Sequence, residues 1–551
     1  MGKPGHRYPQ VEPGAAALVD ATVATAPPAI RVREAQAWAL KARADALQLG
    51  DRGLVLRADL ERAAAIGLDD LPASAITRPL PLVSARAPEV AVRRALVAGA
   101  PIVVVRDRRG IVGGVSSRSA LAGAISLSVA ARLSRALPAW ASDVLASLGR
   151  LAVDRGMRAF LVGGVVRDVL RGGVIERADL DVVIEGDGLG LARALGDEQG
   201  ASVIEHGRFL TASIRRPSGE RVDVATARSE RYEAPGALPR VMPASILPDL
   251  GRRDFTLNAM AVEIGGDMRL WDPHGGRGDL RRRRLRILHP LSFVDDPTRI
   301  FRGARYAARL DLVYDGWTSA CQAFALRLGP YPALSGQRIA AELERILAEA
   351  RPDQALRRLG SAGVFRLLDP RYRFTRATGT LLGALPSALR WARERGLDVA
   401  RLELALVALL AEQSADVRSA ALGRLGLTGE PLSRAGRALE ISRGWIDRLV
   451  ETPAGAQRGR LLRERTDLEL TALWLAGEAA ARTALEWWVD RARRVRPMLR
   501  GEEVVELGVK RGPAVAEVLD GLRDRRLDGG GGDREAEIEY VRHWLEARKE
   551  G

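Results

Sequence analysis

The spacing of apolar residues changes once along the chain, and this change limits the possible fold more than any other feature. From about residue 158 to 279, short apolar runs alternate with segments of helical period, which is typical of a mixed α/β domain. After Asp279 the period stays helical, with breaks at Gly- and Pro-containing turns around residues 329–332, 351–352, 428–431 and 529–532. The sequence therefore predicts an α/β head followed by an all-helical neck, body and tail.

A weak internal repeat precedes the α/β region. Two successive segments share one order of an extended piece, a helix and two short strands. In the second copy the pattern predicts a helix over 88–98 and strands over 102–106 and 111–115. The resulting domain plan is a flexible tail (1–15), a two-copy module (16–130), a helical linker (131–157), a head (158–279), a neck (280–350), and a body with a tail (351–551).

The charge balance is strongly basic. The 551 residues contain 85 Lys+Arg and 69 Asp+Glu, a formal net charge of +16. Such a charge favours a polyanionic partner, because each neutralised phosphate releases counterions. Nearly all the cations are arginine, however, a bias that genome composition alone can produce. Charge therefore permits a nucleic-acid partner without identifying one.

The apolar runs and the single cysteine exclude several classes of protein. No run is long enough for a signal peptide or a bilayer span, so a cytoplasmic protein without a membrane partner is expected. Cys321 is the only cysteine, which excludes an intrachain disulfide and a multi-cysteine metal site. Its apolar helical surroundings predict a small buried side chain and not a reactive thiol.

Two aspartates, Asp179 and Asp181, open the apolar strand LDVVIEG. Alternate residues of a strand project to one face, about 6.6 Å apart along it, so both carboxylates converge on one place. Carboxylates at this spacing can flank a pair of divalent cations, and magnesium is the cation that prefers oxygen ligands. Taken alone, such a pair at an exposed strand end is more often simply solvated.

A second feature lies just upstream, where strand AFLVGG meets a helix through Gly163 and Gly164. Backbone amides at a helix N-terminus attract phosphate, and Arg167 beside Asp168 can offer a fork of donors to its oxygens. This arrangement suits a triphosphate. The alternative is an ordinary strand-to-helix turn in which glycine supplies a positive φ.

Two polar groups follow downstream. Asp223, on strand RVDVATAR, is a candidate third carboxylate from an adjacent strand; alternatively it pairs with Arg228 or Arg215. The cluster after Asp249 could bind the phosphates and ribose of a nucleotide, or it could be a solvated loop. Its candidate ligands are Arg252, Arg253, Asp254 and Asn258.

The helix after Pro297 carries a polar stripe beside an apolar one. Its members Asp296, Arg299, Arg302 and Arg305 recur at intervals of three. A salt-bridged, solvated face is one interpretation of the stripe. The other is a base-selecting surface, because a fixed carboxylate and guanidinium can recognise the Watson–Crick edge of a base.

In this order, LVGGVVRD, DLD, RRDFTLNAMA and DDPTRIFRGARYAARL resemble the class II tRNA nucleotidyltransferases and bacterial poly(A) polymerases of the polymerase β superfamily. The resemblance covers residues 158–350 well and weakens beyond them. The N-terminal repeat resembles a tandem cystathionine-beta-synthase (CBS) pair, a module that often binds adenine nucleotides; a spacing module without a ligand is the alternative.

The resemblance implies a role for each motif. Asp179 and Asp181 would hold two Mg²⁺ ions, with Asp223 as a further catalytic carboxylate. Asp296 and Arg299 would pair with the base of CTP or ATP, and Asp295, where the family more often has Glu, would orient them. The other nucleotide-binding residues would be Gly163, Gly164, Arg167, Asp168, Arg252, Arg253, Asp254, Asn258, Arg302 and Arg305. The helical half would hold tRNA.

The implied activity is template-independent addition of C, A or both to the 3′ end of tRNA. Poly(A) polymerase shares the motifs and stays open, as does the choice among CCA, CC-only and A-only addition. A rival from another class is an adenine-nucleotide sensor with an inactive head. His206 and His289 are interpreted as partly buried structural residues, since two-metal transfer needs no histidine base. The sequence leaves the oligomeric state open.

Overall fold

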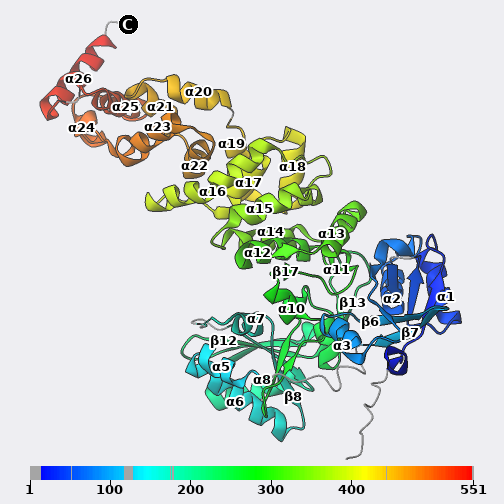
Figure 1. The fold of residues 1–551 in the computed structure, drawn as a ribbon. Coiled ribbons are helices and arrows are strands. Elements are labelled where there is room, and N and C mark those ends of the chain that lie inside the picture. Colours follow the sequence, from blue (N-terminus) through cyan, green and yellow to red (C-terminus); the bar gives the residue numbers. More distant parts are fainter. Residues whose placement is uncertain are drawn as a thin grey trace, which may run out of the picture. The chain divides into compact units, whose positions relative to one another are not determined.

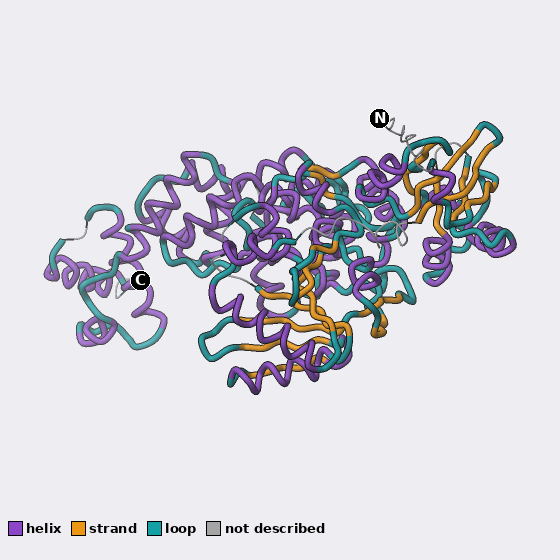
Figure 2. Tube along the Cα trace, turned by 60° about the horizontal axis from the view of Figure 1, so that its bottom comes forward, coloured by secondary structure: helices purple, strands orange, loops and turns teal. Residues whose placement is uncertain are grey.

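The computed structural model describes residues 14–50, 53–116, 128–173, 175, 179–441, 443–530 and 532–548. The chain forms two compact units, Met1–Ser335 and Gly336–Gly551, so the division falls inside the segment predicted as the neck. Within the described residues, every strand belongs to the first unit and the second is helical (Figures 1 and 2). Most of the predicted tail, residues 1–13, lies outside the described residues.

The first unit begins with two small sheets built on one plan. In each sheet a helix joins two parallel strands, and the next strand returns antiparallel. The elements are η1 (Ala15–Leu18), β1 (Val23–Ala26), α1 (Val32–Lys41), β2 (Ala46–Leu49), β3 (Gly53–Leu56), α2 (Arg57–Ala65), η2 (Ala73–Ile76) and β4 (Arg78–Pro79), then β5 (Leu82–Ser84), α3 (Glu89–Val97), β6 (Ile102–Asp107) and β7 (Gly110–Ser116). The predicted helix and two strands of the second copy are thus confirmed, while residues 117–127 lie outside the described residues.

The head is built on a seven-stranded sheet of order β10-β11-β12-β9-β8-β15-β16. Only the central β9–β12 pair is parallel. The elements are α5 (Ala130–Ala136), α6 (Ala139–Asp154), β8 (Arg158–Val162), α7 (Gly164–Arg171), β9 (Leu180–Glu185), α8 (Gly188–Gln199), β10 (Ser202–His206), η3 (Gly207–Phe209), β11 (Thr211–Arg215), β12 (Arg221–Thr226), β13 (Arg228–Arg231), β14 (Arg240–Pro243), α9 (Ile246–Gly251), η4 (Thr256–Asn258), β15 (Ala261–Ile264), β16 (Leu270–Trp271) and α10 (Gly276–Arg281).

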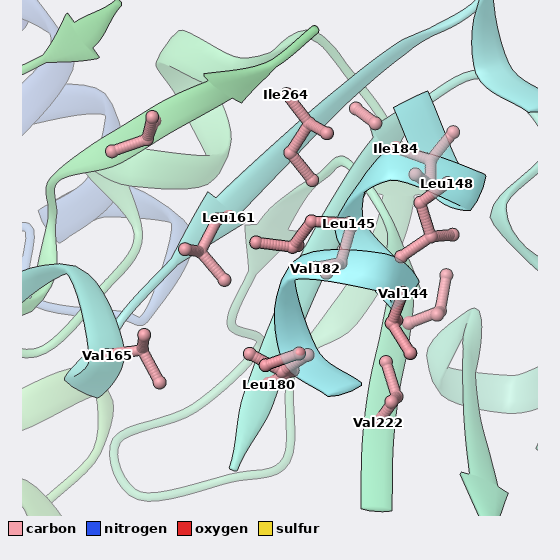
Figure 3. Close-up of a cluster of buried hydrophobic side chains, with 14 of the residues drawn as sticks. Val144, Leu145, Leu148, Leu161, Val165, Leu180, Val182, Ile184, Val222 and Ile264 are labelled. Carbon is pink, nitrogen blue, oxygen red and sulfur yellow. The ribbon is translucent and has the colours of Figure 1, made fainter. Parts of the chain in front are cut away.

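One face of this sheet is covered by α6, part of the segment predicted as a linker. Figure 3 shows Val144, Leu145 and Leu148 of α6 against strand residues such as Leu180 and Val182. Alternate strand residues face opposite sides, so Asp181 lies on the face away from this core. The other face carries a second buried apolar cluster, which includes Phe160, Val162 and Val183, and Asp181 precedes Val183 on that face.

The first unit ends in the segment that follows the head. Its elements are β17 (Arg284–Leu285), α11 (Ser292–Asp295), α12 (Thr298–Leu310), β18 (Val313–Tyr314) and α13 (Gly316–Leu328). Of the predicted apolar stripe of α12, Ile300, Ala304 and Ala307 are buried, whereas the fourth member, Ala308, is half-buried. The helix places its polar residues beside the head's polar cluster, as described below.

The second unit has its own core. Helices α17 and α22 are buried on nearly all sides, as expected of helices that are apolar all round, and they contact each other. The elements are α14 (Gly336–Leu347), α15 (Pro352–Ser361), η5 (Val364–Leu367), α16 (Arg376–Glu394), α17 (Arg401–Leu410), α18 (Ala415–Arg424), α19 (Gly429–Leu439), α20 (Arg443–Glu451), α21 (Ala456–Arg463), α22 (Asp467–Ala476), α23 (Ala479–Asp490), η6 (Ala492–Arg494), α24 (Gly501–Glu506), α25 (Pro513–Leu527) and α26 (Arg534–Ala547). The predicted all-helical character of residues 351–551 is confirmed in its described part. For the neck the prediction is wrong, because the short strands β17 and β18 pair within it.

None of the described helices combines the length and the apolar character that crossing a bilayer requires.

Candidate active site

Three aspartates gather at the centre of the head sheet. Strands β9 and β12 run parallel with Asp181 directly opposite Asp223, so both side chains leave the same face. Asp179 stands two residues before Asp181, where the strand begins, and is exposed. The predicted placement of Asp223 on a strand adjacent to the aspartate pair is therefore confirmed.

Negative charge accumulates at this place. Asp181 is accessible to solvent, yet protein surrounds it closely enough that burial raises the pKa of its carboxyl to about 6; Asp223 and Asp179 raise it further, while Arg253 lowers it. Asp223 accepts hydrogen bonds from Ser213 Oγ at 2.6 Å and Arg221 Nε at 2.9 Å. Its arginine partner is thus Arg221, and the alternative pairing with Arg228 or Arg215 is wrong.

The chemistry of these side chains fits a divalent cation. Among the described residues no three His, Cys, Asp or Glu side chains are already arranged as a metal site. The carboxylates of Asp179 and Asp181 nevertheless supply the hard oxygen ligands that Mg²⁺ prefers. Their mutual repulsion with Asp223 is what a bound cation would relieve.

The turn from β8 into α7 brings backbone next to Asp181. Gly163 has φ 74°, and a Cβ at this position would lie 3.2 Å from Asp181 Oδ2. Glycine is therefore needed both for its backbone conformation and for its close approach. The start of α7, whose first amides have no partner within the helix, therefore lies close to Asp181.

Arg167, on the first turns of α7, links two of the predicted motifs. Its side chain is buried and donates from Nε and Nη2 to the two oxygens of Asp168, each at 2.9 Å. Its Nη1 donates to Asn258 Oδ1, also at 2.9 Å. The guanidinium therefore ties α7 to the polar cluster that precedes β15.

The same cluster is tied to α12 through Asp254. This buried carboxylate accepts from Asn258 Nδ2 at 3.0 Å and forms an ion pair with Arg302 at 2.8 Å. Tyr306, one turn further along α12, has three guanidinium groups within 6 Å of its ring: Arg167, Arg302 and Arg305. Three of the predicted motifs, those of α7, Asp254 with Asn258, and α12, thus meet in one network of ion pairs and hydrogen bonds.

Arg252 and Arg253 share one fully buried carboxylate, Asp249. Arg252 Nη2 donates to Asp249 Oδ1 at 2.7 Å and Arg253 Nη2 to Asp249 Oδ2 at 2.9 Å. Arg252 also pairs with Glu230 at 2.7 Å. The alternative of a solvated loop is wrong for this cluster, because its side chains are locked by buried partners.

Arg299 and Asp296, predicted as the base-selecting pair, are both held in place. Arg299 is buried and donates from Nη1 to Ser292 Oγ and from Nη2 to the carbonyl oxygen of Arg252, each at 2.7 Å. Asp296 Oδ1 accepts from the amide and the hydroxyl of Thr298 at the start of α12. The alternative of a solvated face is thus wrong for Arg299.

Two residues with clear roles in this geometry were not predicted from the sequence. Asp249 has a detectable signal, since it lies three and four residues before two arginines. Tyr306 lies four residues after Arg302 on a helix, which is also a contact distance. Neither pattern is distinctive without the fold.

His206, His289 and Cys321 were predicted to have no catalytic role. His289 is buried, and its burial, with Arg62 and Arg299 nearby, holds its pKa well below the usual value, so it is neutral. His206 lies exposed at the end of β10, and its expected partial burial is wrong. Cys321 is buried as predicted, and burial raises the pKa of its thiol to about 12.

Known proteins resemble this chain over the same region. The family model described as "Poly A polymerase head domain" matches residues 159–286. A CC-adding tRNA nucleotidyltransferase of Deinococcus radiodurans is 35% identical over 70% of this chain and 89% of its own length. The chain belongs to the class II tRNA nucleotidyltransferase family.

Other members of the family extend the likeness. An A-adding tRNA nucleotidyltransferase of Geobacter sulfurreducens is 31% identical over 74% of this chain, which spans about half, 47%, of that relative's length. The solved Thermotoga maritima CCA-adding enzyme complexed with tRNA is 26% identical, with a TM-score of 0.66 over 77% of this chain and 100% of its own. This family likeness covers the head and reaches well into the helical half.

Proposed function

We propose that this chain adds C, A or both to the 3′ end of tRNA, with CTP or ATP as the nucleotide donor and pyrophosphate as the second product. The observation that carries the proposal is the pairing of Asp181 with Asp223 beside the Gly163 turn and the arginine cluster. The relatives named for CC, A and CCA addition to tRNA support the same chemistry.

Asp179 and Asp181 are the side chains that would hold two Mg²⁺ ions. When bound, such ions lower the pKa of an attacking hydroxyl and stabilise charge on a leaving pyrophosphate. Asp223, restrained by Ser213 and Arg221, keeps a third carboxylate beside them. The expected chemistry is in-line attack of the RNA 3′-hydroxyl on the α-phosphate, without a covalent enzyme intermediate.

The triphosphate would lie against the start of α7. Gly163 and Gly164 allow its oxygens to approach backbone amides, and Arg253 adds positive charge near Asp181. Arg167, paired with Asp168, joins this turn to Asn258, so hydrogen bonds connect the proposed phosphate site to the proposed ribose site. Arg302 and Arg305 extend the positive charge along α12.

Base choice would depend on Asp296 and Arg299. Their hydrogen bonds to Thr298, Ser292 and the backbone of Arg252 fix them before a nucleotide arrives. A donor and acceptor fixed in this way discriminate between bases without a template. The helical unit would hold the tRNA by contacts with the shape and the phosphates of the RNA. Side chains reach poorly into the deep groove of an RNA helix, so its sequence is not what they recognise.

Transfer to tRNA transcripts that end before CCA, after C and after CC is the decisive experiment. Each transcript is incubated with Mg²⁺ and CTP, ATP or both, and products are resolved on a sequencing gel. CCA, CC-only or A-only addition would each support the proposal and define its type. Long A tails on unrelated RNA would replace it with poly(A) polymerase, and no transfer would favour the nucleotide sensor.

We further propose that the N-terminal module is a tandem CBS-like pair. The repeated order of strand, helix, parallel strand and antiparallel strand supports this assignment. The ligand expected of such a pair is an adenine nucleotide. Calorimetric titration with AMP, in the presence of saturating CTP to occupy the head, tests this, and absence of binding would favour a spacing module.

A further inference from the structure

The N-terminal module contacts the segment that leads into the base-selecting pair. Arg78 is fixed by two hydrogen bonds to the buried Asp59 and donates from Nη1 to the carbonyl oxygen of Leu288 at 2.7 Å. Two further hydrogen bonds join the module to this part of the chain: Trp317 Nε1 to the carbonyl of Thr77 and Arg286 Nη2 to the carbonyl of Ala98, each at 2.9 Å. The module is therefore joined to residues 286–295 and α13.

The deepest of these contacts is an ion pair. Arg62, on α2 of the module, donates from Nη1 to Asp295 Oδ2 at 2.9 Å. The side chain of Asp295 is 0% exposed, whereas that of Arg62 is 31% exposed. Asp295 directly precedes Asp296, so a residue 233 positions away in the sequence contacts the neighbour of the base-selecting carboxylate.

Few other groups balance the charge of Asp295. Its Oδ1 has no hydrogen-bond partner in the described part of the chain, and the nearby His289, 3.8 Å away, is neutral. The other cation that acts on Asp295 is Arg299, four residues further on and itself buried. If Arg62 were lost, Asp295 would lose its hydrogen-bond donor and keep Arg299 as its remaining cationic partner, so the carboxylate and the guanidinium would be expected to move toward each other.

Such a shift would disturb base selection. The guanidinium of Arg299 is positioned by Ser292 Oγ and the carbonyl of Arg252, both at 2.7 Å. A turn of that group toward Asp295 would break one of these hydrogen bonds and change where its donors point. Displacements of about 1 Å in a positioning group can change rates by about 10²-fold.

We propose that Arg62 of the N-terminal module is a positioning residue for nucleotide selection, acting through Asp295 on Asp296 and Arg299. The N-terminal module then contributes to nucleotide selection and is not only a domain attached to the head. This inference rests on the proposed function, because it concerns the choice between CTP and ATP.

The test compares Arg62→Met with a matched control, Arg57→Met, in the full-length protein. Arg57 lies on the same helix, and its ion pairs with Asp45 and Glu61 stay inside the module. Two quantities are measured: kcat/KM for CTP and for ATP on the preferred tRNA transcript, and hydrogen–deuterium exchange of residues 288–299. The second readout does not depend on activity.

For Arg62→Met we expect the ratio of kcat/KM for the cognate over the non-cognate nucleotide to fall about tenfold or more, with faster exchange in residues 288–299. Adding Asp295→Asn, which removes the uncompensated carboxylate, should restore part of the ratio. Arg57→Met should change neither readout.

Equal ratios in Arg62→Met and Arg57→Met would overturn the inference. This holds even if Arg62→Met unfolds at a lower temperature, because the loss of an ion pair that only anchors the module would explain the lower unfolding temperature. An inactive wild-type protein would instead overturn the proposed function. The two failures are therefore distinguishable.

Discussion

Single buried carboxylates position the arginines of this site. Burial alone would raise the pKa values of Asp249 and Asp254, but their arginine partners outweigh it and hold both pKa values below the usual range. Both residues are therefore charged under ordinary conditions, and each fixes the direction of at least one guanidinium group. Hydrogen bonds between ionised groups are strong enough to preorganise donors for a phosphate ligand.

The first prediction at this scale concerns the aspartate pair. Asp181→Asn and Asp179→Asn should each reduce transfer by about 10³-fold or more, because each removes a carboxylate that we propose as a ligand for a cation. The folded state should keep its stability, since either change relieves repulsion among Asp179, Asp181 and Asp223. Transfer assays and thermal unfolding measure the two effects.

Asp154→Asn, on the exposed surface of α6, is the control for these substitutions and should leave transfer unchanged. An Asp181→Asn protein that retains more than a tenth of the wild-type rate would refute the assignment of this residue as a metal ligand.

The second prediction concerns pH and the buried His289. Its folded-state pKa lies well below the unfolded value of about 6.5, so below that pH the unfolded chain binds a proton that the folded chain does not. The free energy of unfolding should therefore fall as pH drops below about 6.5, by up to about 1.4 kcal/mol per pH unit from this group. Urea denaturation between pH 7.5 and 5 measures the slope.

His289→Gln should flatten this slope, while the same substitution at the exposed His206 is the control. A slope that is equal in the wild type and His289→Gln would show that other groups cause the acid sensitivity.

At the scale of secondary-structure elements, the candidate site lies on one face of the head sheet and α6 covers the other. Residues at alternate positions of β9 pack against α6 (Figure 3). The opposite face carries Asp181 together with a second apolar cluster. The helix that covers the sheet thus determines the strand positions without contacting the polar site. Substitutions in α6 are therefore expected to change the stability without changing the chemistry.

A large-to-small substitution in α6 tests this separation. Leu148→Ala removes a fully buried side chain and should lower the free energy of unfolding by about 2–5 kcal/mol. Val153→Ala on the same helix, where Val153 is 71% exposed, should change it by less than about 0.5 kcal/mol. Both proteins should keep the wild-type kcat well below their unfolding temperatures; a large loss of kcat in folded Leu148→Ala would contradict the separation.

At the scale of the whole molecule, the net charge of +16 favours binding of a long polyanion. A protein that contacts six or more phosphates loses about 10³-fold in affinity between 50 and 200 mM salt. We expect a loss of this order for tRNA and a much smaller one for CTP, which carries few phosphates. Filter binding at several salt concentrations measures both, and a loss below tenfold for tRNA would argue against extensive phosphate contacts.

Much about this protein follows from the sequence by itself, because local physics governs it. Periodicity predicted the change from an α/β head to a helical half, and the module's repeat, since the spacing of apolar residues reports which face of an element is buried. The Asp179 and Asp181 pair and the Gly163 turn are also local patterns, which short motifs can carry.

Contacts between distant residues were decided only by the tertiary structure. Asp223 faces Asp181 because β12 lies parallel to β9, a neighbour that spacing along the chain does not identify. The burial of Arg299 and the contact of Arg62 with Asp295 depend on packing across 47 and 233 residues. Charges in a buried place interact strongly with whichever groups the fold brings near, so these pairings, unlike the motifs, required the fold.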